Sequence, residues 1–173
     1  EESYVIAWMY PYLTPHGLIM KINRDPTPLD PTTIRNDLDF WDWYTRRLVS
    51  RPAFLRDVVA RKSFSKLRSS IGGLYANRGL FAEAEQAFRE SWLLYPLSPE
   101  ANFRLTQEVL IPQRRTDEAI TLMRTFGEQD PGNTRTFEFV GYLENLKRTS
   151  RTIAEIEGRR RDGRIEISDA MTL

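Results

Sequence analysis

The stretch LRSSIGGLYANRGLFAEAEQAFRESWLLYP, residues 67–96, decides the fold of this chain. Its apolar residues recur every three or four positions on both sides of Gly79, which predicts two amphipathic helices folded back on each other. Gly72 and Ala84 lack the bulk that would hold the helices apart, and Gly79 permits the turn between them. Pro96 is expected to end the second helix, because its ring cannot continue the hydrogen-bond ladder.

The same pattern returns further along the chain with a small irregularity. Leu105 follows Ile71 by 34 residues, whereas Pro131 follows Pro96 by 35. One residue is therefore inserted in the second copy, and we expect it between the two helices at residues 111–113, where a proline distorts the helix end. The chain thus predicts a short array of helix pairs, each buried against its neighbours.

Helix start signals flank this array on its N-terminal side. Asp30 followed by Pro31 predicts an N-cap and a first helical residue, with a helix that runs to about Ser50. Beyond Pro52 the apolar pattern fits either one long helix or two helices with a bend near Lys62. The sequence leaves both alternatives open.

On the C-terminal side the pattern continues and then weakens. A helix is predicted to start at Thr116, and another at Asn133 or Thr134. After Lys147 the apolar spacing is poorer, so residues 148–173 are expected to form a capping helix and a flexible tail.

The first 29 residues do not have a helical pattern. The segments 4–8 (YVIAW) and 18–22 (LIMKI) are short, apolar and partly β-branched, and prolines and a glycine separate them. They predict a two-stranded element or two extended arms that pack on the helices, since an isolated hairpin is marginal in water. The predicted divisions are extended arms at 1–29, N-terminal helices at 30–63, repeats at 64–147, and the cap and tail at 148–173.

Composition limits the chemistry that this chain can perform. Its 173 residues are 40% hydrophobic and 12% aromatic, which is enough for a globular core. The absence of cysteine excludes a disulfide framework, thiolate chemistry and any zinc site built on sulfur. His16 is the only histidine and lies in a turn-like segment, so we expect neither a catalytic base nor a metal site. No cofactor is expected.

The formal net charge of +1 hides an uneven distribution. Residues 46–78 contain nine Lys or Arg and a single acid, Asp57, and the charge balance reverses after that segment. This pattern favours a basic face for an acidic partner or anionic lipid headgroups, although a solvated helix face is the plainer interpretation. Nucleic-acid binding is not expected, because the overall charge is nearly balanced. The candidate basic face consists of Arg46, Arg47, Arg61 and Lys62.

Aromatic residues are concentrated in the first quarter of the chain. The set comprises Trp8, Tyr10, Tyr12, Trp41, Trp43 and Tyr44. Exposed rings stack on sugars or bases, whereas buried rings join the N-terminal arms to the first helix. Because Trp41 and Trp43 are two apart on a helix, we expect Trp43 to be the exposed ring. A carbohydrate-binding or small catalytic domain that uses these aromatics is the alternative function.

Residues 64–147 resemble tetratricopeptide repeats. The resemblance rests on Gly72, Tyr75, Gly79, Phe81, Ala84, Phe88 and Pro96, which have the spacing of that 34-residue repeat. It implies a short superhelix of antiparallel helix pairs whose concave face holds a protein or peptide partner. The candidate contact residues on that face are Lys66, Ser69, Gly73, Asn77, Arg104 and Gln107. The clamp that some family members use for C-terminal carboxylates is not matched, because Ser69 and Gly73 stand where a lysine and an asparagine are needed.

A second resemblance covers nearly the whole chain. Segments 8–13 (WMYPYL), 15–23 (PHGLIMKIN) and 60–69 (ARKSFSKLRS) are similar to the soluble C-terminal part of bacterial multi-pass membrane proteins that resemble lipid-linked-sugar glycosyltransferases. The resemblance implies an extracytoplasmic, periplasmic domain without catalytic residues of its own. Together the two resemblances predict a non-catalytic interaction domain that accompanies a membrane glycosyltransferase-like protein.

Overall fold

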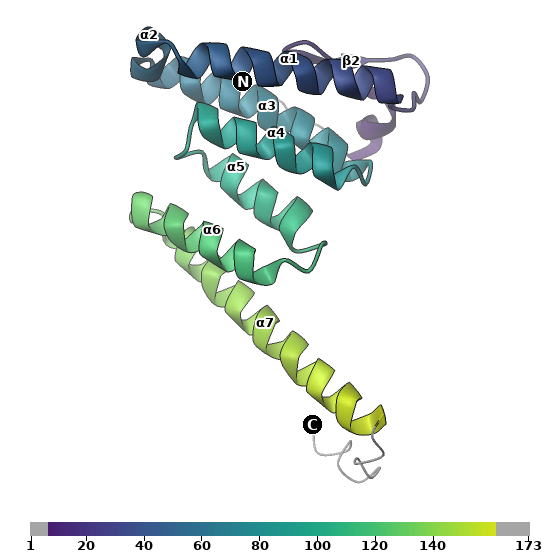
Figure 1. The fold of residues 1–173 in the computed structure, drawn as a ribbon, viewed down its shortest axis with the longest axis vertical. Coiled ribbons are helices and arrows are strands. Elements are labelled where there is room, and N and C mark those ends of the chain that lie inside the picture. Colours follow the sequence, from purple (N-terminus) through teal and green to yellow (C-terminus); the bar gives the residue numbers. More distant parts are fainter. Residues whose placement is uncertain (1–6, 162–173) are drawn as a thin grey trace. The chain divides into compact units, whose positions relative to one another are not determined.

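The protein is mainly helical and carries one small antiparallel sheet near its N-terminus, as the sequence predicts (Figure 1). The computed structural model describes residues 7–161, and the chain divides into two compact units between Arg115 and Thr116. Unit 1 contains the 3-10 helix η1 (Ala7–Tyr12), the strands β1 (Leu13–His16) and β2 (Ile19–Ile22), the helices α1 (Pro31–Val49), α2 (Pro52–Arg56), α3 (Val58–Asn77), α4 (Phe81–Leu94) and α5 (Pro99–Arg104), and the π-helix η2 (Leu105–Leu110). Unit 2 contains α6 (Thr116–Gln129) and α7 (Thr134–Arg161).

The pair of α3 and α4 forms the centre of unit 1. Ser65 Oγ lies 2.9 Å from Ser91 Oγ near one end of the pair, and the Phe88 ring lies against Gly72 further along. The contacting residue in α4 comes earlier in the sequence as the contacting residue in α3 comes later, so the two helices are antiparallel. A Cβ built on Gly72 would lie 2.9 Å from Phe88 Cε1, which explains why the helix seam needs glycine there.

The turn between α3 and α4 is a Schellman motif centred on Gly79. Gly79 has a φ of +73°, in the left-handed region that glycine enters without a steric penalty. Its N–H donates to Ala76 O at 3.0 Å, and Leu80 N–H donates to Tyr75 O at 2.9 Å. The predicted turn at Gly79 is therefore confirmed, and the carbonyl groups that end α3 are satisfied.

Helix α1 begins where its capping signals predict. Asp30 accepts hydrogen bonds from the backbone N–H groups of Thr32 and Thr33, both at 2.9 Å, and Pro31 is the first helical residue. The next helical segment is divided, as one of the two alternatives predicts. The break lies at Asp57 rather than near Lys62, because Asp57 caps α3 by accepting from Ala60 N–H at 2.9 Å.

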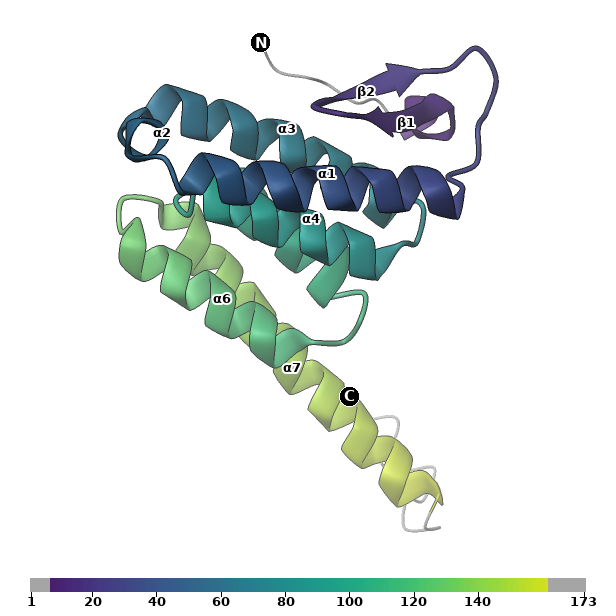
Figure 2. The ribbon, with the colours of Figure 1, turned by 45° about the horizontal axis from the view of Figure 1, so that its top comes forward.

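A hairpin and an extended connector complete unit 1 (Figure 2). The two-stranded element is confirmed, but the first strand is β1 and not the predicted segment 4–8, whose described residues lie in η1. Asn23 N–H donates to Tyr12 O at 2.8 Å, so Tyr12 and Asn23 form a hydrogen-bonded pair. Hydrogen-bonded and non-hydrogen-bonded pairs alternate along an antiparallel ladder, and Pro15 therefore lies opposite Met20 in a non-hydrogen-bonded pair. A proline is tolerated there because no N–H is needed. Gly17, with a φ of +62°, begins the two-residue turn.

The inserted residue of the second copy lies earlier than predicted. The backbone widens into the π-helix η2, in which Ile111 N–H donates to Thr106 O at 3.0 Å, five residues back. Because a π turn contains more residues than an α turn, it absorbs the extra residue inside the helix rather than at 111–113. Ser98 caps the start of this helix by accepting from Ala101 N–H at 3.2 Å.

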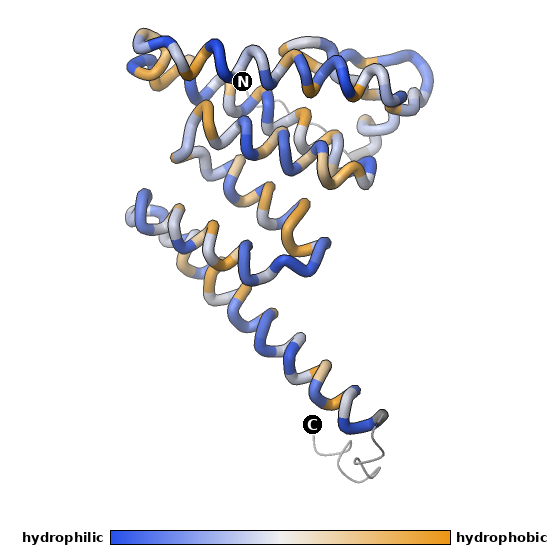
Figure 3. Tube along the Cα trace, viewed as in Figure 1, coloured by the Kyte–Doolittle hydropathy of each residue, from blue (hydrophilic) through white to orange (hydrophobic). Residues whose placement is uncertain are grey.

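Unit 2 is an antiparallel pair whose second helix is longer than expected. Ion pairs join Lys147 to Asp117 and Arg124 to Glu144, so α7 runs back along α6. The predicted separate cap after residue 147 is wrong, because α7 continues without a break to Arg161. Residues 148–160 are exposed, and this part of α7 is mostly hydrophilic (Figure 3). The sequence predicts the tail from Gly158 onward, but residues 158–161 belong to α7, and residues 162–173 lie outside the described residues. Among residues 7–161, no helix combines the length and the apolar character that crossing a bilayer requires.

Candidate functional site

Two of the predicted concave-face residues, Ser69 and Arg104, are engaged in contacts within unit 1. Ser69 is 0% exposed, so its side chain is not available to a partner and it leaves the set of candidate contacts. Arg104 forms an ion pair with Glu108, with Nε 2.7 Å from Oε1, and donates from Nη1 to Ser69 O at 3.1 Å. Its guanidinium carbon lies 5.5 Å from the centre of the Phe88 ring. Gly73 provides the space for this arginine, since a Cβ there would lie 1.5 Å from Nη2.

Other members of that face remain accessible. Asn77 and Gln107 are exposed, and Lys66 is half-buried. Asn77 borders a shallow pocket of about 350 Å³ together with Tyr10 and Glu108. The predicted face is therefore interrupted, with a small pocket of mixed lining at its accessible end.

The predicted basic residues lie in two groups, each next to an aromatic ring. At the end of α1, the guanidinium carbon of Arg47 lies 5.6 Å from the Trp43 ring centre, and Arg46 pairs with Asp42. At the start of α3, the Arg61 guanidinium carbon and the Lys62 Nζ lie 5.5 Å and 5.6 Å from the centre of the Tyr95 ring. Arg61 also donates to Leu94 O at 3.0 Å, which fixes it against the end of α4.

The N-terminal aromatics do not form one platform. Trp41 is 0% exposed, and its indole N–H donates to Gly17 O at 3.1 Å, which holds the hairpin against α1. Trp43 is 52% exposed and Trp8 is 66% exposed, on different elements. As predicted, Trp41 belongs to the core and Trp43 is the exposed ring of the pair.

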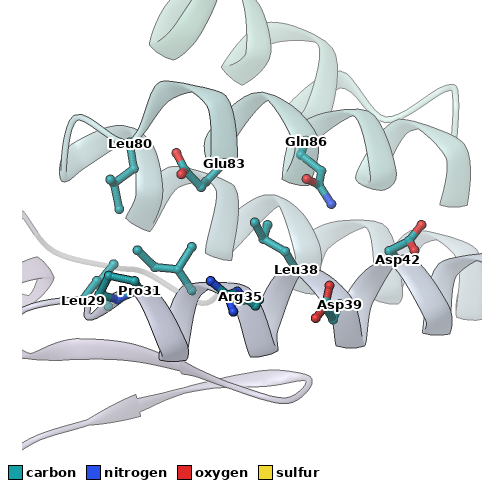
Figure 4. A pocket seen from close by; sticks show the side chains of 10 residues that line it. Leu29, Pro31, Arg35, Leu38, Asp39, Asp42, Leu80, Glu83 and Gln86 are labelled. Atoms are coloured by element: carbon teal, nitrogen blue, oxygen red, sulfur yellow. The ribbon is translucent and has the colours of Figure 1, made fainter.

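A groove of about 620 Å³ lies between α1 and α4 (Figure 4). The side chains of the two helices face each other across it. Its apolar floor consists of Leu29, Pro31, Ile34, Leu38 and Leu80. Because the groove exists only where the two helices meet, no pattern within either helix alone predicts it.

The rim of this groove is predominantly acidic. Asp39, Asp42 and Glu83 line it, against one cation, Arg35. Asp42 is paired with Arg46, so Asp39 and Glu83 carry most of the uncompensated charge of the rim. An apolar floor with an acidic rim matches a segment that presents aliphatic side chains flanked by Lys or Arg.

A buried ionic network connects α1, α3 and α4. Arg68 is 0% exposed and donates from Nη1 to Asp37 Oδ2 at 2.8 Å and from Nε to Glu90 Oε2 at 2.6 Å. The Tyr75 hydroxyl donates to the same Asp37 oxygen at 2.7 Å. The Arg68 guanidinium carbon also lies 5.2 Å from the centre of the Trp41 ring. One arginine thereby fixes three helices in register beneath the groove's two walls.

Burial dominates the electrostatics of this network. Burial raises the pKa of Glu90, although the positive charge of Arg68 and a hydrogen bond from Gln86 oppose the shift. Burial also raises the pKa of the Tyr75 hydroxyl, and the negative charge of Asp37 adds to it, so Tyr75 remains a donor. Each charged side chain of the network has an ionic partner within the protein, which favours a structural role. Asp37 Oδ1 and Arg68 Nη2 are buried without a hydrogen-bond partner among the described residues.

The sequence holds a signal for this network that motif analysis missed. Asp37 lies three residues after Ile34 and four before Trp41, and Arg68 lies three before Ile71. Each charge therefore falls on the apolar stripe of its own helix, where a charged side chain is buried only with an ionic partner.

Comparison of the chain with protein-family models, with curated proteins and with solved structures found no match.

Proposed function

We propose that this chain is a non-catalytic helical-repeat domain that binds a protein partner. The bound part of the partner is a basic, amphipathic segment. The observation that carries the proposal is the groove between α1 and α4, with its apolar floor and acidic rim. Helices that bind in such grooves bury an apolar face and pair their flanking charges with the rim. The groove takes the place of the concave face as the principal partner site, because Ser69 and Arg104 are engaged within unit 1.

The helix pairs are proposed to be tetratricopeptide-type repeats of a short superhelix. Support comes from the spacing of 34 to 35 residues and from the close contact between Gly72 and Phe88. The stack is short, and the N-terminal elements take part in its core through Trp41.

We also propose that the domain accompanies a membrane glycosyltransferase-like protein on the extracytoplasmic side of a bacterial membrane, and that any catalysis resides in that membrane part. The support is the resemblance of segments 8–13, 15–23 and 60–69. Segment 60–69 is distant in sequence from the first two, which are adjacent, yet Leu67 lines the same small apolar pocket of unit 1 as Met9 and Met20. An upstream reading frame that encodes a run of membrane spans would support this assignment, and one without spans would refute it.

The groove is tested by binding of a labelled model peptide with the repeat Leu-Lys-Lys-Leu-Leu-Lys-Leu, followed by fluorescence anisotropy. The double variant Asp39→Lys, Glu83→Lys reverses the charge of the rim without altering a buried residue, and it should weaken binding by at least about tenfold. The control, Asn77→Lys with Gln107→Lys, adds two cations on the predicted concave face and changes the net charge by +2, against +4 for the rim variant, so its loss of binding free energy should be less than half as large.

A larger loss of peptide affinity in the control variant than in the rim variant would refute binding in the groove and favour binding on the concave face. Equal affinity of all three proteins would show that neither surface binds such a segment. A melting curve of each variant verifies that the fold is retained.

A further inference from the structure

The corner where α1, α2 and α3 meet exposes an unusual set of aliphatic side chains. Leu55 is 44% exposed, Val58 48% and Val59 75%. Phe54, in contrast, is buried, with its ring centre 6.0 Å from that of Phe64, so it anchors α2 on α3. The outward residues therefore do not serve the core of unit 1, and they belong to the segment in which the chain turns from α2 into α3 (Figure 1).

Cations surround these aliphatic residues. Residues 46–62 contain six Lys or Arg and one acid. That acid, Asp57, caps α3. Arg51 immediately precedes the short α2 helix and Arg56 is its last residue, and both are exposed. Lys62 is exposed one turn into α3. The corner, defined by Arg51, Leu55, Arg56, Val58, Val59 and Lys62, thus combines a small apolar tip with a positive border.

We propose that this corner docks on the surface of an anionic lipid bilayer. A bilayer offers both components that the corner needs: an acyl boundary into which Leu and Val insert, and negative headgroups for the flanking cations. A nucleic acid supplies the negative charge but no apolar phase for the exposed valines. The mixture of aliphatic tip and basic border therefore favours lipid over nucleic acid.

The docking surface uses residues other than those of the groove, so the two proposals stand or fall separately. Each cation near an anionic surface strengthens binding by about fivefold, and salt screens this contribution. The inserted aliphatic residues add a component that salt does not weaken.

The experiment measures cosedimentation of the full chain with vesicles of phosphatidylcholine alone and of phosphatidylcholine mixed with phosphatidylserine. We expect binding to the mixed vesicles only, weaker at high salt. Arg51→Gln with Arg56→Gln should reduce the affinity by roughly 25-fold, from two cations at about fivefold each. Val58→Asp with Val59→Asp should abolish binding.

Matched controls lie on the hairpin. Lys21→Gln with Arg24→Gln removes two exposed cations, and Ile19→Asp replaces an aliphatic side chain that is 59% exposed. Both variants should bind vesicles as the unaltered chain does. Soluble glycerophosphoserine should not compete with the vesicles, because it lacks an apolar phase.

Several outcomes would overturn the proposal: no binding to the mixed vesicles, binding that is insensitive to salt, unchanged binding by the double valine variant, or equal losses in the hairpin controls. Competition by free headgroup would indicate a phosphate site instead of a bilayer surface. Tighter binding to duplex DNA that depends on the arginines but not on the valines would identify a nucleic-acid surface.

Discussion

Replacement of Arg68 by methionine tests the buried network most directly. The substitution keeps a side chain of similar length but removes two hydrogen-bonded ion pairs, of 2.8 Å to Asp37 and 2.6 Å to Glu90. Both carboxylates remain buried, at 6% and 7% exposure, without their cation. Breaking such a buried pair typically costs about 3 to 5 kcal/mol, which for a chain of this size lowers the melting temperature by roughly 10 to 20 °C.

The cost should depend on pH in a defined direction. Burial already raises the pKa of Glu90 in the unaltered protein, and removal of Arg68 takes away the principal charge that opposes the shift. A carboxyl group whose folded pKa is raised favours the fold below its unfolded pKa, near 4.5, and loses that contribution as pH rises through the folded pKa. The destabilisation of the variant should therefore be largest at neutral pH and smaller in mild acid.

Urea unfolding followed by circular dichroism at neutral and mildly acidic pH measures both effects. Arg46→Met is the matched control, because that side chain is 73% exposed and its pair with Asp42 lies on the surface, so its loss should cost less than about 1 kcal/mol. Adding Asp37→Asn and Glu90→Gln to the Arg68 variant should recover part of the stability. A loss below about 1 kcal/mol in the Arg68 variant, or a loss that grows as pH falls, would refute the proposed role of the network.

Two further predictions concern the α3–α4 pair. Gly72→Leu should destabilise by about 1 to 3 kcal/mol in thermal unfolding, because even a Cβ would lie 2.9 Å from the Phe88 ring; a melting temperature at or above that of the unaltered chain would contradict the close packing of the helices. Glu85 should stabilise the protein above its unfolded pKa of 4.5, since hydrogen bonds from Arg115 and Arg89 lower its folded pKa to about 2. Glu85→Gln should thus reduce stability at neutral pH, and the difference in urea midpoints should fall away between about 4.5 and 2; a constant difference would show that the charge is unimportant.

Local signals in the sequence located most of the helical framework. Asp30 with Pro31 defined the start of α1, and Gly79 defined the turn between α3 and α4, because capping and left-handed turns depend on residues within a few positions of each other. The first strand was placed wrongly. Pro15 makes the segment 13–16 look unlike a strand. It is tolerated because it occupies a non-hydrogen-bonded position of the β1–β2 ladder, where no N–H is needed.

The features that the sequence did not reveal depend on contacts between helices. The groove forms where α1 meets α4, so its floor and rim combine residues such as Leu38 and Glu83, which are far apart in the chain. The burial of Ser69 and the hydrogen bond from Arg104 to Ser69 O likewise follow from the packing of α5 and η2 on α3. A repeat register assigns residues to a face, but it does not determine which of them the neighbouring helix covers.

The contacts of Arg78 have a consequence for the order in which the chain assembles. Its Nη2 donates to the carbonyl oxygens of Tyr10, Pro11 and Thr27, at 2.8, 2.9 and 3.1 Å, and thereby clasps the N-terminal segment to the end of α3. During synthesis the segment emerges from the ribosome long before Arg78 does, and a lone hairpin is marginal in water. The N-terminal segment of unit 1 is consequently synthesised first but becomes fixed late, because its docking requires the end of α3 to be in place.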